Sequence, residues 1–233
     1  MATLNPRGSV TAGRPAAELL AERYAATAGA PITAAIPPKF AAELTRQVAT
    51  LQPQLAIEIG MANGLSSLAI LAGLPPGGQL ISIDPFQDEQ WGGQGRSLVT
   101  QSDRAGSHRL IQDFDYLALP QLLQEKCAAQ FIYIDGMHTF DYVTLDAFFA
   151  DKLLAVGGVI AFNDCGFRAI HKYLKFFRSH RHYEELPTAL VPDYRGSNPL
   201  ISLLRRAEGR SNQDRYFRKL DGWEPEHNFF RRF

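Results

Sequence analysis

The chain has 233 residues, of which 45% are hydrophobic, and its 24 basic and 24 acidic residues give a formal net charge of zero. This length suits one domain with a substantial core, and the balanced charge disfavours a partner that is nucleic acid or an anionic membrane surface. Neither a signal peptide nor an apolar run long enough to cross a bilayer is recognisable, so we expect a soluble, cytoplasmic protein.

Short apolar runs alternate with helical patterns along most of the chain. Helical spacing of apolar residues predicts two helices ahead of the first strand, at 14–27 and 37–51. The predicted strands then lie at 55–59, 79–84, 108–112, 130–135 and 157–163. The predicted helices between and after them lie at 64–74, 95–105, 117–127, 140–154 and 166–180. Strands that alternate with helices indicate a parallel sheet with helices on both faces.

The C-terminal part breaks this alternation. Strand-like runs at 182–187 and 198–206 are joined by a loop without a helical pattern, so we expect an antiparallel hairpin on one edge of the sheet. From residue 207 the chain is polar and then aromatic, which suggests a docked arm or an oligomer contact. The predicted fold class is therefore α/β: a three-layer, Rossmann-like, doubly wound and mostly parallel sheet with a C-terminal antiparallel hairpin.

Four of the predicted strands have an acidic residue at or next to their carboxyl end: Glu58, Asp84, Asp135 and Asp164. In an open parallel sheet, ligands bind in the crevice outside the carboxyl ends of the strands. A single acid at such a place could be a helix cap, although four at the same edge are better explained by a ligand. We therefore expect a ligand site at this edge.

The first of these turns, residues 58–64, reads EIGMANG. Gly60 and Gly64 allow the backbone to approach a ligand closely, and the helix that follows offers free N–H groups. The G-x-x-x-G spacing differs from the G-x-G-x-x-G of pyrophosphate binders. Glu58 suits a ligand with a positive charge, and Asp84 is placed where an acid can accept both ribose hydroxyls. An adenosine with a cationic amino-acid tail fits this set better than NAD.

Together with this turn, two longer motifs carry a family resemblance. They read DGMHTFDYVTLD at 135–146 and GGVIAFND at 157–164. The combination resembles class I S-adenosylmethionine-dependent methyltransferases, in the small-molecule O-methyltransferase branch that includes macrolide-sugar and catechol-type enzymes. Phe140 replaces the tyrosine of the family pattern. The resemblance covers about residues 40–206. We expect one domain, 1–233, with an N-terminal helical extension (1–38), a cofactor-binding core (40–206) and a C-terminal arm (207–233).

The resemblance also implies roles for individual residues. Gly60 and Gly64 would lie along the methionine moiety of S-adenosylmethionine, Glu58 would orient that loop or the amino group, and Asp84 would hold the ribose. The full set expected at the cofactor is Glu58, Gly60, Met61, Asn63, Gly64, Ser66, Asp84, Pro85, Asp115, Tyr116 and Asp135. Asp115 and Tyr116 would line the adenine.

A divalent metal is a further expectation from the resemblance. Catechol-type relatives bind a metal through acids at the ends of the fourth and fifth strands, and the matching positions are Asp135, Asn163 and Asp164. Their oxygen donors suit Mg²⁺. The order Asn then Asp at the last pair departs from the relatives, so sites with and without metal both stay open.

His138 and Asp135 are the expected catalytic residues. A neutral imidazole can accept a proton from a hydroxyl, and the histidine of D-x-x-H in the macrolide-sugar relatives resembles such a base. His138 could instead only cap the following helix.

We therefore expect an S-adenosylmethionine-dependent O-methyltransferase that acts on a small molecule such as a sugar or natural product and assembles as a homo-oligomer, such as a dimer. The alternatives are a nicotinamide-dependent oxidoreductase and a catalytically silent module that binds S-adenosylmethionine.

Overall fold

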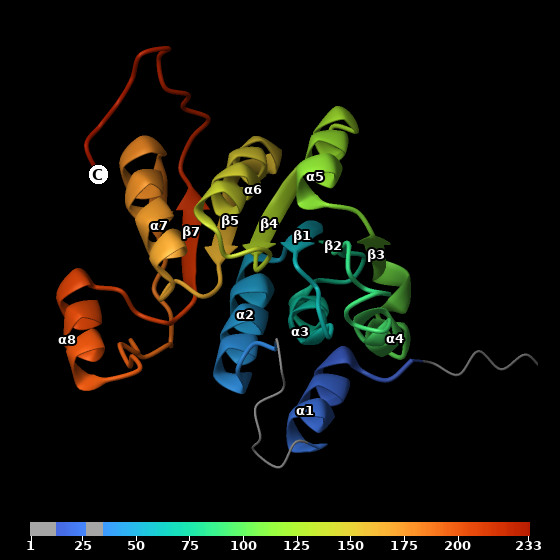
Figure 1. Ribbon diagram of the computed structural model, residues 1–233. Helices are drawn as coiled ribbons and strands as arrows, with labels where there is room; N and C mark the ends of the chain where they lie inside the picture. The colour runs from blue at the N-terminus through green and yellow to red at the C-terminus, as the bar shows by residue number, and fades with distance from the viewer. Residues whose placement is uncertain (1–12, 27–34) are drawn as a thin grey trace, which may run out of the picture.

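A seven-stranded sheet forms the centre of the molecule, as the computed structural model shows for residues 13–26 and 35–233 (Figure 1). Its strands are β1 (Leu55–Ile59), β2 (Gln79–Ile83), β3 (His108–Ile111), β4 (Ala129–Ile134), β5 (Leu154–Phe162), β6 (Tyr183–Glu185) and β7 (Arg215–Lys219). Across the sheet, the strands lie in the order β3-β2-β1-β4-β5-β7-β6. The first five run parallel, and β7 is antiparallel to both β5 and β6.

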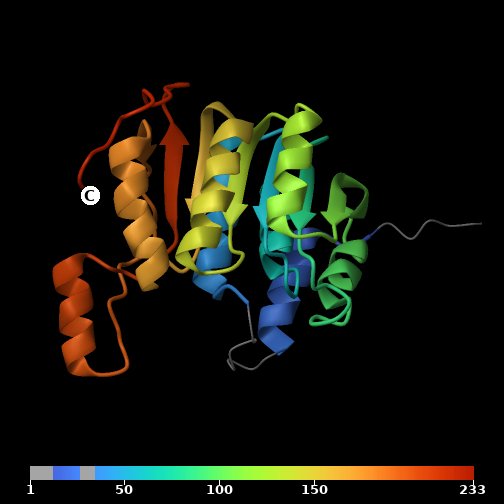
Figure 2. The same cartoon turned by 45° about the horizontal axis from the view of Figure 1, so that its top comes forward.

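Helices cover both faces of this sheet (Figure 2). They are α1 (Ala16–Ala26), α2 (Pro38–Leu51), α3 (Leu65–Gly73), α4 (Gln94–Thr100), α5 (Asp115–Gln124), α6 (Phe140–Leu153), α7 (Arg168–His180) and α8 (Pro199–Glu208). Buried side chains of α1, α2 and α3 form one core with one face of the strands, and those of α5, α6 and α7 form a second core with the other face. The predicted three-layer α/β fold is confirmed.

Strand β4 shows how the sequence produces two cores. Its side chains alternate in direction, so that Phe131 and Tyr133 enter the core under α2 and α3. Ile132 and Ile134 enter the opposite core under α5 and α6. Because both faces are covered, the strand is apolar at nearly every position, as expected of a central parallel strand.

The prediction of a strand at 198–206 is wrong, because this segment is helix α8. The side chain of Asn198 caps it by accepting from the backbone N–H of Ile201, Pro199 occupies the first turn, and Gly209 ends it with a positive φ of 67°. The antiparallel pairing beside β5 exists, but its strands are β6 and β7. Strand β7 lies within the segment that we expected to be an arm.

Most other element boundaries differ from the prediction by one to three residues. The largest difference is at α4, which ends at Thr100, whereas the prediction extends to Ala105, the first residue of a short 3-10 turn, Ala105–Ser107. Residue 27 of the first predicted helix lies outside the described residues. Within the described part of the chain, none of the helices is long and apolar enough to cross a membrane.

The core under α7 gives a first prediction. The ring of Phe177 is fully buried and packs against Phe162, Phe217 and Tyr183 at centroid distances of 4.6–5.4 Å. We expect Phe177→Ala to lower the free energy of unfolding by roughly 3–5 kcal/mol, because it leaves a cavity in a close-packed core. Urea titration measures this value. The control is Phe148→Ala on α6, where the side chain is exposed, and equal losses in the two variants would contradict the packing described.

Candidate active site

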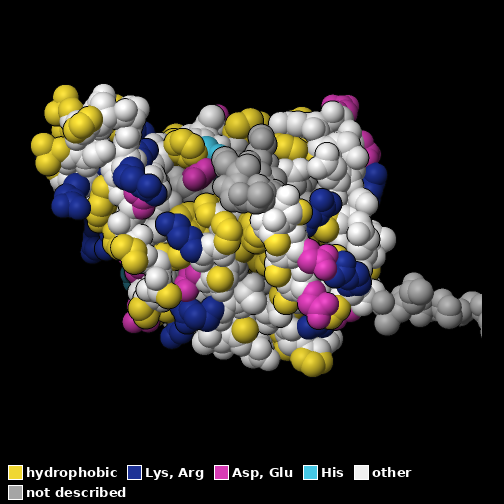
Figure 3. Space-filling view, turned by 90° about the horizontal axis from the view of Figure 1, so that it is seen from below, with side chains coloured by type: hydrophobic (Ala, Val, Ile, Leu, Met, Phe, Trp, Pro, Cys, Tyr) yellow, Lys and Arg dark blue, Asp and Glu magenta, His cyan; other side chains and the backbone are white. Residues whose placement is uncertain are grey.

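The carboxyl ends of four parallel strands meet at one edge of the sheet. The first residue after each of β1, β2, β4 and β5 donates its backbone N–H to the last residue of a neighbouring strand, at 2.8–3.0 Å. These four residues are Gly60, Asp84, Asp135 and Asn163. The sheet register therefore brings together four loops that are far apart in the sequence. Seen from below (Figure 3), this face has hydrophobic side chains over its centre and charged side chains mainly toward its edges.

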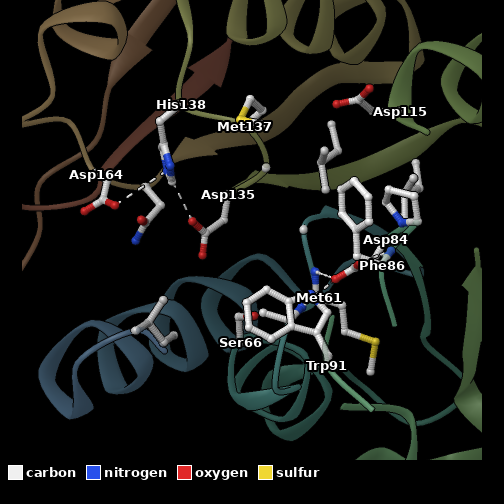
Figure 4. A pocket seen from close by; sticks show the side chains of 18 of the residues that line it. Met61, Ser66, Asp84, Phe86, Trp91, Asp115, Asp135, Met137, His138 and Asp164 are labelled. Atoms are coloured by element: carbon white, nitrogen blue, oxygen red, sulfur yellow. Dashed lines mark hydrogen bonds and ion pairs between the residues drawn. The ribbon is translucent and has the colours of Figure 1, made fainter. Parts of the chain in front are cut away.

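A pocket of about 440 Å³ lies at this edge. Most of the predicted site residues line it: Gly60, Met61, Ser66, Asp84, Pro85, Asp115, Asp135, His138, Asn163 and Asp164. Figure 4 shows that His138, Asp135 and Asp164 lie at one end and Asp115 at the other, beyond Met137. Among the residues that we expected at the cofactor, Glu58, Asn63, Gly64 and Tyr116 do not line it.

Asp84 ties the loops after β1 and β2 together. Its Oδ2 accepts from the backbone N–H groups of Met61 (3.1 Å) and Ala62 (2.7 Å) and from the side-chain amide of Gln87 (3.1 Å). Its Oδ1 accepts from the backbone N–H of Phe86 at 2.8 Å. These donors occupy most of the acceptor capacity of one carboxylate, so holding the loops is its evident role here. The ribose contact of Asp84 stays a prediction.

Gly60 is required by the close approach of two strand ends. Its φ is +87°, and a Cβ at this position would lie 2.2 Å from the carbonyl oxygen of Asp135. Any other residue would therefore push the loops after β1 and β4 apart. The close contact with Asp135 therefore requires glycine at position 60, the first glycine of the 58–64 turn, without reference to a ligand.

The structure separates Glu58 from the pocket, which corrects the expected contact with the cofactor. The side chain is fully buried on the α3 side of β1, where Oε2 accepts from the hydroxyls of Ser67 (2.5 Å) and Ser82 (2.6 Å). Burial raises the pKa of Glu58 to about 7, against the partial opposition of these hydrogen bonds. Glu58 thus joins α3 to β1 and β2, and it interacts with the pocket through the charge of Asp135.

His138 lies between two carboxylates. Its Nε2 is 3.5 Å from Oδ1 of Asp135 and 3.6 Å from Oδ2 of Asp164. Burial raises the pKa of Asp135 to about 6, and the charge of Asp164 raises it further. Burial lowers the pKa of His138, but Asp135 and Asp164 outweigh this effect and raise it overall. The group is therefore suited to hold a proton and, when neutral, to accept one.

Asn163 is oriented by two residues that the sequence analysis missed. Its Nδ2 donates to Oη of Tyr133 (3.1 Å) and to Oδ1 of Asp214 (3.0 Å), and Tyr133 donates to the other oxygen of Asp214. Asp214 and Tyr133 are fully buried. The amide nitrogen of Asn163 is thus anchored, and because the residue lines the pocket, its amide oxygen is the atom that a ligand there could use. Asp214 precedes β7, in the segment that we expected to be an arm, so its pairing could not be predicted.

The far end of the pocket is aromatic. Phe86, Phe114 and Tyr142 line it beside Asp115, and the rings of Phe86 and Phe114 meet edge to face at 5.7 Å. Tyr116 stacks on the Phe114 ring at 5.1 Å and lies outside the pocket. Aromatic rings with one buried carboxyl suit a flat, hydrogen-bonding group such as a nucleobase. The aromatic end of the pocket is thus formed by three rings that the sequence analysis did not select.

The donor set at the His138 end fits a divalent cation in its chemistry. Asp135, Asp164 and the amide oxygen of Asn163 offer oxygen ligands, and among the described residues His138 is the one cationic group paired with the two desolvated carboxylates. Among the described residues, however, no group of three His, Cys, Asp or Glu side chains is placed to hold a metal. A metal would therefore depend on Asn163.

Glu58 provides a prediction for stability. Its pKa lies at about 7 in the folded protein and near 4.5 when exposed, so the unfolded state loses this proton first as pH rises. The buried carboxyl therefore destabilises the fold progressively between about pH 4.5 and pH 7. We expect Glu58→Gln to remove this pH-dependent loss, which amounts to roughly 3 kcal/mol of the free energy of unfolding. Urea unfolding of both proteins from pH 5 to pH 8 measures the difference, and parallel curves would show that Glu58 ionises freely.

Comparison with known proteins agrees with this geometry. Residues 57–165 match the family model of a methyltransferase domain. The chain shares 14% identity and a TM-score of 0.65 with TomG, an O-methyltransferase from Streptomyces achromogenes in complex with S-adenosylmethionine, covering 88% of this chain and 90% of that one. It shares 17% identity and a TM-score of 0.65 with an O-methyltransferase from Bacillus cereus in complex with S-adenosylhomocysteine, covering 91% of this chain and 94% of that one.

A third similar structure is the S-adenosylhomocysteine-bound methyltransferase PaMTH1 of Podospora anserina, at 14% identity and a TM-score of 0.66, covering 95% of this chain and all of that one. No curated protein matches the chain by sequence. The expected resemblance is confirmed at the level of the fold: residues 57–165 match the model of a methyltransferase domain, and the chain shares its fold with solved structures that are named O-methyltransferases.

Proposed function

We propose that the protein transfers a methyl group from S-adenosylmethionine to a hydroxyl of a small molecule. One observation carries the proposal: a histidine held between two carboxylates lies in the same pocket as the β1 turn and an aromatic end suited to adenine. The similar structures from Streptomyces achromogenes and Bacillus cereus are named O-methyltransferases, and they support the choice of oxygen as acceptor.

The reaction needs the acceptor oxygen, the methyl group and the sulfur in line. The oxygen attacks the methyl carbon, the carbon–sulfur bond breaks with its electrons on sulfur, and the hydroxyl proton passes to the imidazole of His138. Much of the rate would come from alignment of the two bound reactants and exclusion of water. Asp135 and Asp164 stabilise the imidazolium that results, because each lies within 3.6 Å of its Nε2.

The proposal includes Mg²⁺ as an optional cofactor. Asp135, Asn163 and Asp164 would hold it, and Asp214 would keep the oxygen of Asn163 available. A bound divalent cation acidifies an acceptor hydroxyl by acting as a Lewis acid. The same proposal includes a cytoplasmic location and a small-molecule acceptor such as a sugar or natural product. It also includes assembly as a homo-oligomer or dimer, without nucleic acid or membrane partners.

Replacement of the base tests the proposal directly. We expect His138→Ala to lower kcat for methyl transfer by roughly 10²–10⁴-fold, because the acceptor hydroxyl loses its proton acceptor. Affinity for S-adenosylhomocysteine should hardly change, since the cofactor does not depend on this proton. In the wild type, kcat should rise with pH through a pKa above that of free histidine, and this rise should vanish in the variant. Steady-state kinetics and isothermal titration give both values.

The matched control is His182→Ala, which removes an exposed histidine paired with Asp221. Full turnover by His138→Ala would rule out the base. Binding of NAD in place of S-adenosylhomocysteine would instead favour an oxidoreductase, and cofactor binding without methyl transfer to any acceptor would favour a silent module.

Metal dependence is a separate prediction. We expect the wild type to bind Mg²⁺. Asp164→Ala should lower the affinity for Mg²⁺ by more than the roughly tenfold that is typical of substitutions outside the ligand shell, because one of three donors is lost. Chelation should lower methyl transfer, and added Mg²⁺ should restore it. Asp221→Ala, at an exposed carboxylate, is the control. Unchanged activity of a metal-free protein would remove the metal and leave methyl transfer intact.

A further inference from the structure

A second carboxyl lies directly behind Asp115 at the aromatic end of the pocket. Asp146, in the second turn of α6, has no exposed surface, and neither of its oxygens has a hydrogen-bond donor among the described residues. A buried, ionised carboxylate without any donor would cost far more than one hydrogen bond. The function proposed above assigns no role to this residue.

Asp115 and Asp146 approach each other across Gly136. A Cβ built on Gly136 would lie 3.8 Å from Oδ2 of Asp146 and 3.9 Å from Oδ2 of Asp115, so both carboxyls face the same small space. Oδ1 of Asp115 is already engaged by the backbone N–H of Tyr116 at 2.7 Å. Asp115 and Gly136 line the pocket, whereas Asp146 does not.

The surroundings favour a neutral Asp146. Burial raises its pKa to about 9, and the charge and hydrogen bond of Asp115 raise it further. The titratable groups that interact with Asp146 are Asp115 from α5, Tyr142 from its own helix and Tyr173 from α7, none of which is a cation. Two carboxyls in such a place can be satisfied together when one proton lies between them.

We propose that Asp146 is a neutral carboxylic acid that donates its proton to Asp115, and that this contact positions Asp115 as the acceptor for the exocyclic amino group of the cofactor's adenine. The identity of the ligand in this inference rests on the proposed function, whereas the proton shared by Asp146 and Asp115 is independent of it. Asp146 is thus a positioning residue: it contacts Asp115 and leaves the adenine to Asp115 and the three rings.

The ring arrangement supports adenine as the group recognised. Phe86, Phe114 and Tyr142 offer faces and edges to a flat base, and Asp115 is the carboxyl among them that lines the pocket. An ionised acceptor discriminates in favour of an amino group and against a carbonyl oxygen, because the carbonyl would leave the carboxylate without a donor. The site would therefore prefer adenosine over a nucleoside that lacks the amino group.

The first test needs no cofactor. Infrared difference spectra at pH 7 between the wild type and Asp146→Asn should show one neutral carboxylic acid band in the wild type that the variant lacks. Absence of that band would overturn the shared proton, whatever the protein binds. Because this measurement is independent of S-adenosylhomocysteine, it separates a failure of this inference from a failure of the proposed function.

The second test is the affinity for S-adenosylhomocysteine by isothermal titration from pH 7 to pH 10. The affinity of the wild type should fall by roughly tenfold as Asp146 ionises, since adenine binding buries Asp115 and Asp146 further. Asp146→Asn, which can still donate to Asp115, should bind within about twofold of the wild type at pH 7 and show no such decline. Asp146→Leu should bind roughly tenfold more weakly at pH 7, since an apolar side chain leaves Asp115 without this donor.

The ligand itself supplies the last control. The analogue of S-adenosylhomocysteine with hydrogen in place of the amino group should bind the wild type roughly tenfold more weakly, and Asp115→Ala should bind both ligands equally. Equal affinity of Asp146→Leu and the wild type, or an unchanged decline with pH in Asp146→Asn, would overturn the positioning role. Thermal unfolding of each variant shows whether it is folded under the titration conditions.

Discussion

The pocket depends on the hydrogen bonds that the carboxylate of Asp84 accepts. It accepts backbone N–H groups from the loop after β1 and from its own loop after β2, so that one side chain fixes the relative position of two of the four loops at the carboxyl edge. The loops after β1 and β4 are in turn held by the contact between Gly60 and Asp135, where no side chain fits. Given these two constraints, the positions of Met61, Asp135 and His138 follow from the sheet register, because each lies within a few residues of a strand end.

The same edge contains several acids, and burial divides them into different chemical states. Glu58 and Asp146 are enclosed by protein and have raised pKa values of about 7 and about 9, so they are protonated more readily than an exposed acid. Asp84 is satisfied by N–H donors. Asp135 and Asp164 face the pocket and have His138 between them, which makes this end the place where a proton can be exchanged. In the proposed function, the two ends of the pocket have different tasks, proton transfer at His138 and base recognition at Asp115.

Local patterns in the sequence predicted most of the sheet and one end of the site. Apolar runs located β1 to β5, and the acids at their ends located the carboxyl edge, because both depend on residues that are adjacent in the sequence. Helix α8 was missed even though Asn198, Pro199 and Gly209 are ordinary helix boundaries, because its apolar residues, Leu200, Leu203 and Leu204, were assigned to a strand. Asp214, Tyr133 and Asp146 could not be found, since their roles depend on pairings across 30 or more residues. Glu58 was misplaced because the direction in which a strand side chain points is not evident at a strand end.

A crystal structure of the wild-type protein with S-adenosylhomocysteine tests the central claim most directly, since that claim concerns which end of the pocket does which task. The account predicts the adenine among Phe86, Phe114 and Tyr142 with its amino group on Asp115, and the sulfur toward His138 with the homocysteine along the Gly60 turn. A nucleoside in the reverse orientation, with the base beside His138 and the sulfur beside Asp115, or a ligand outside this pocket, would contradict it.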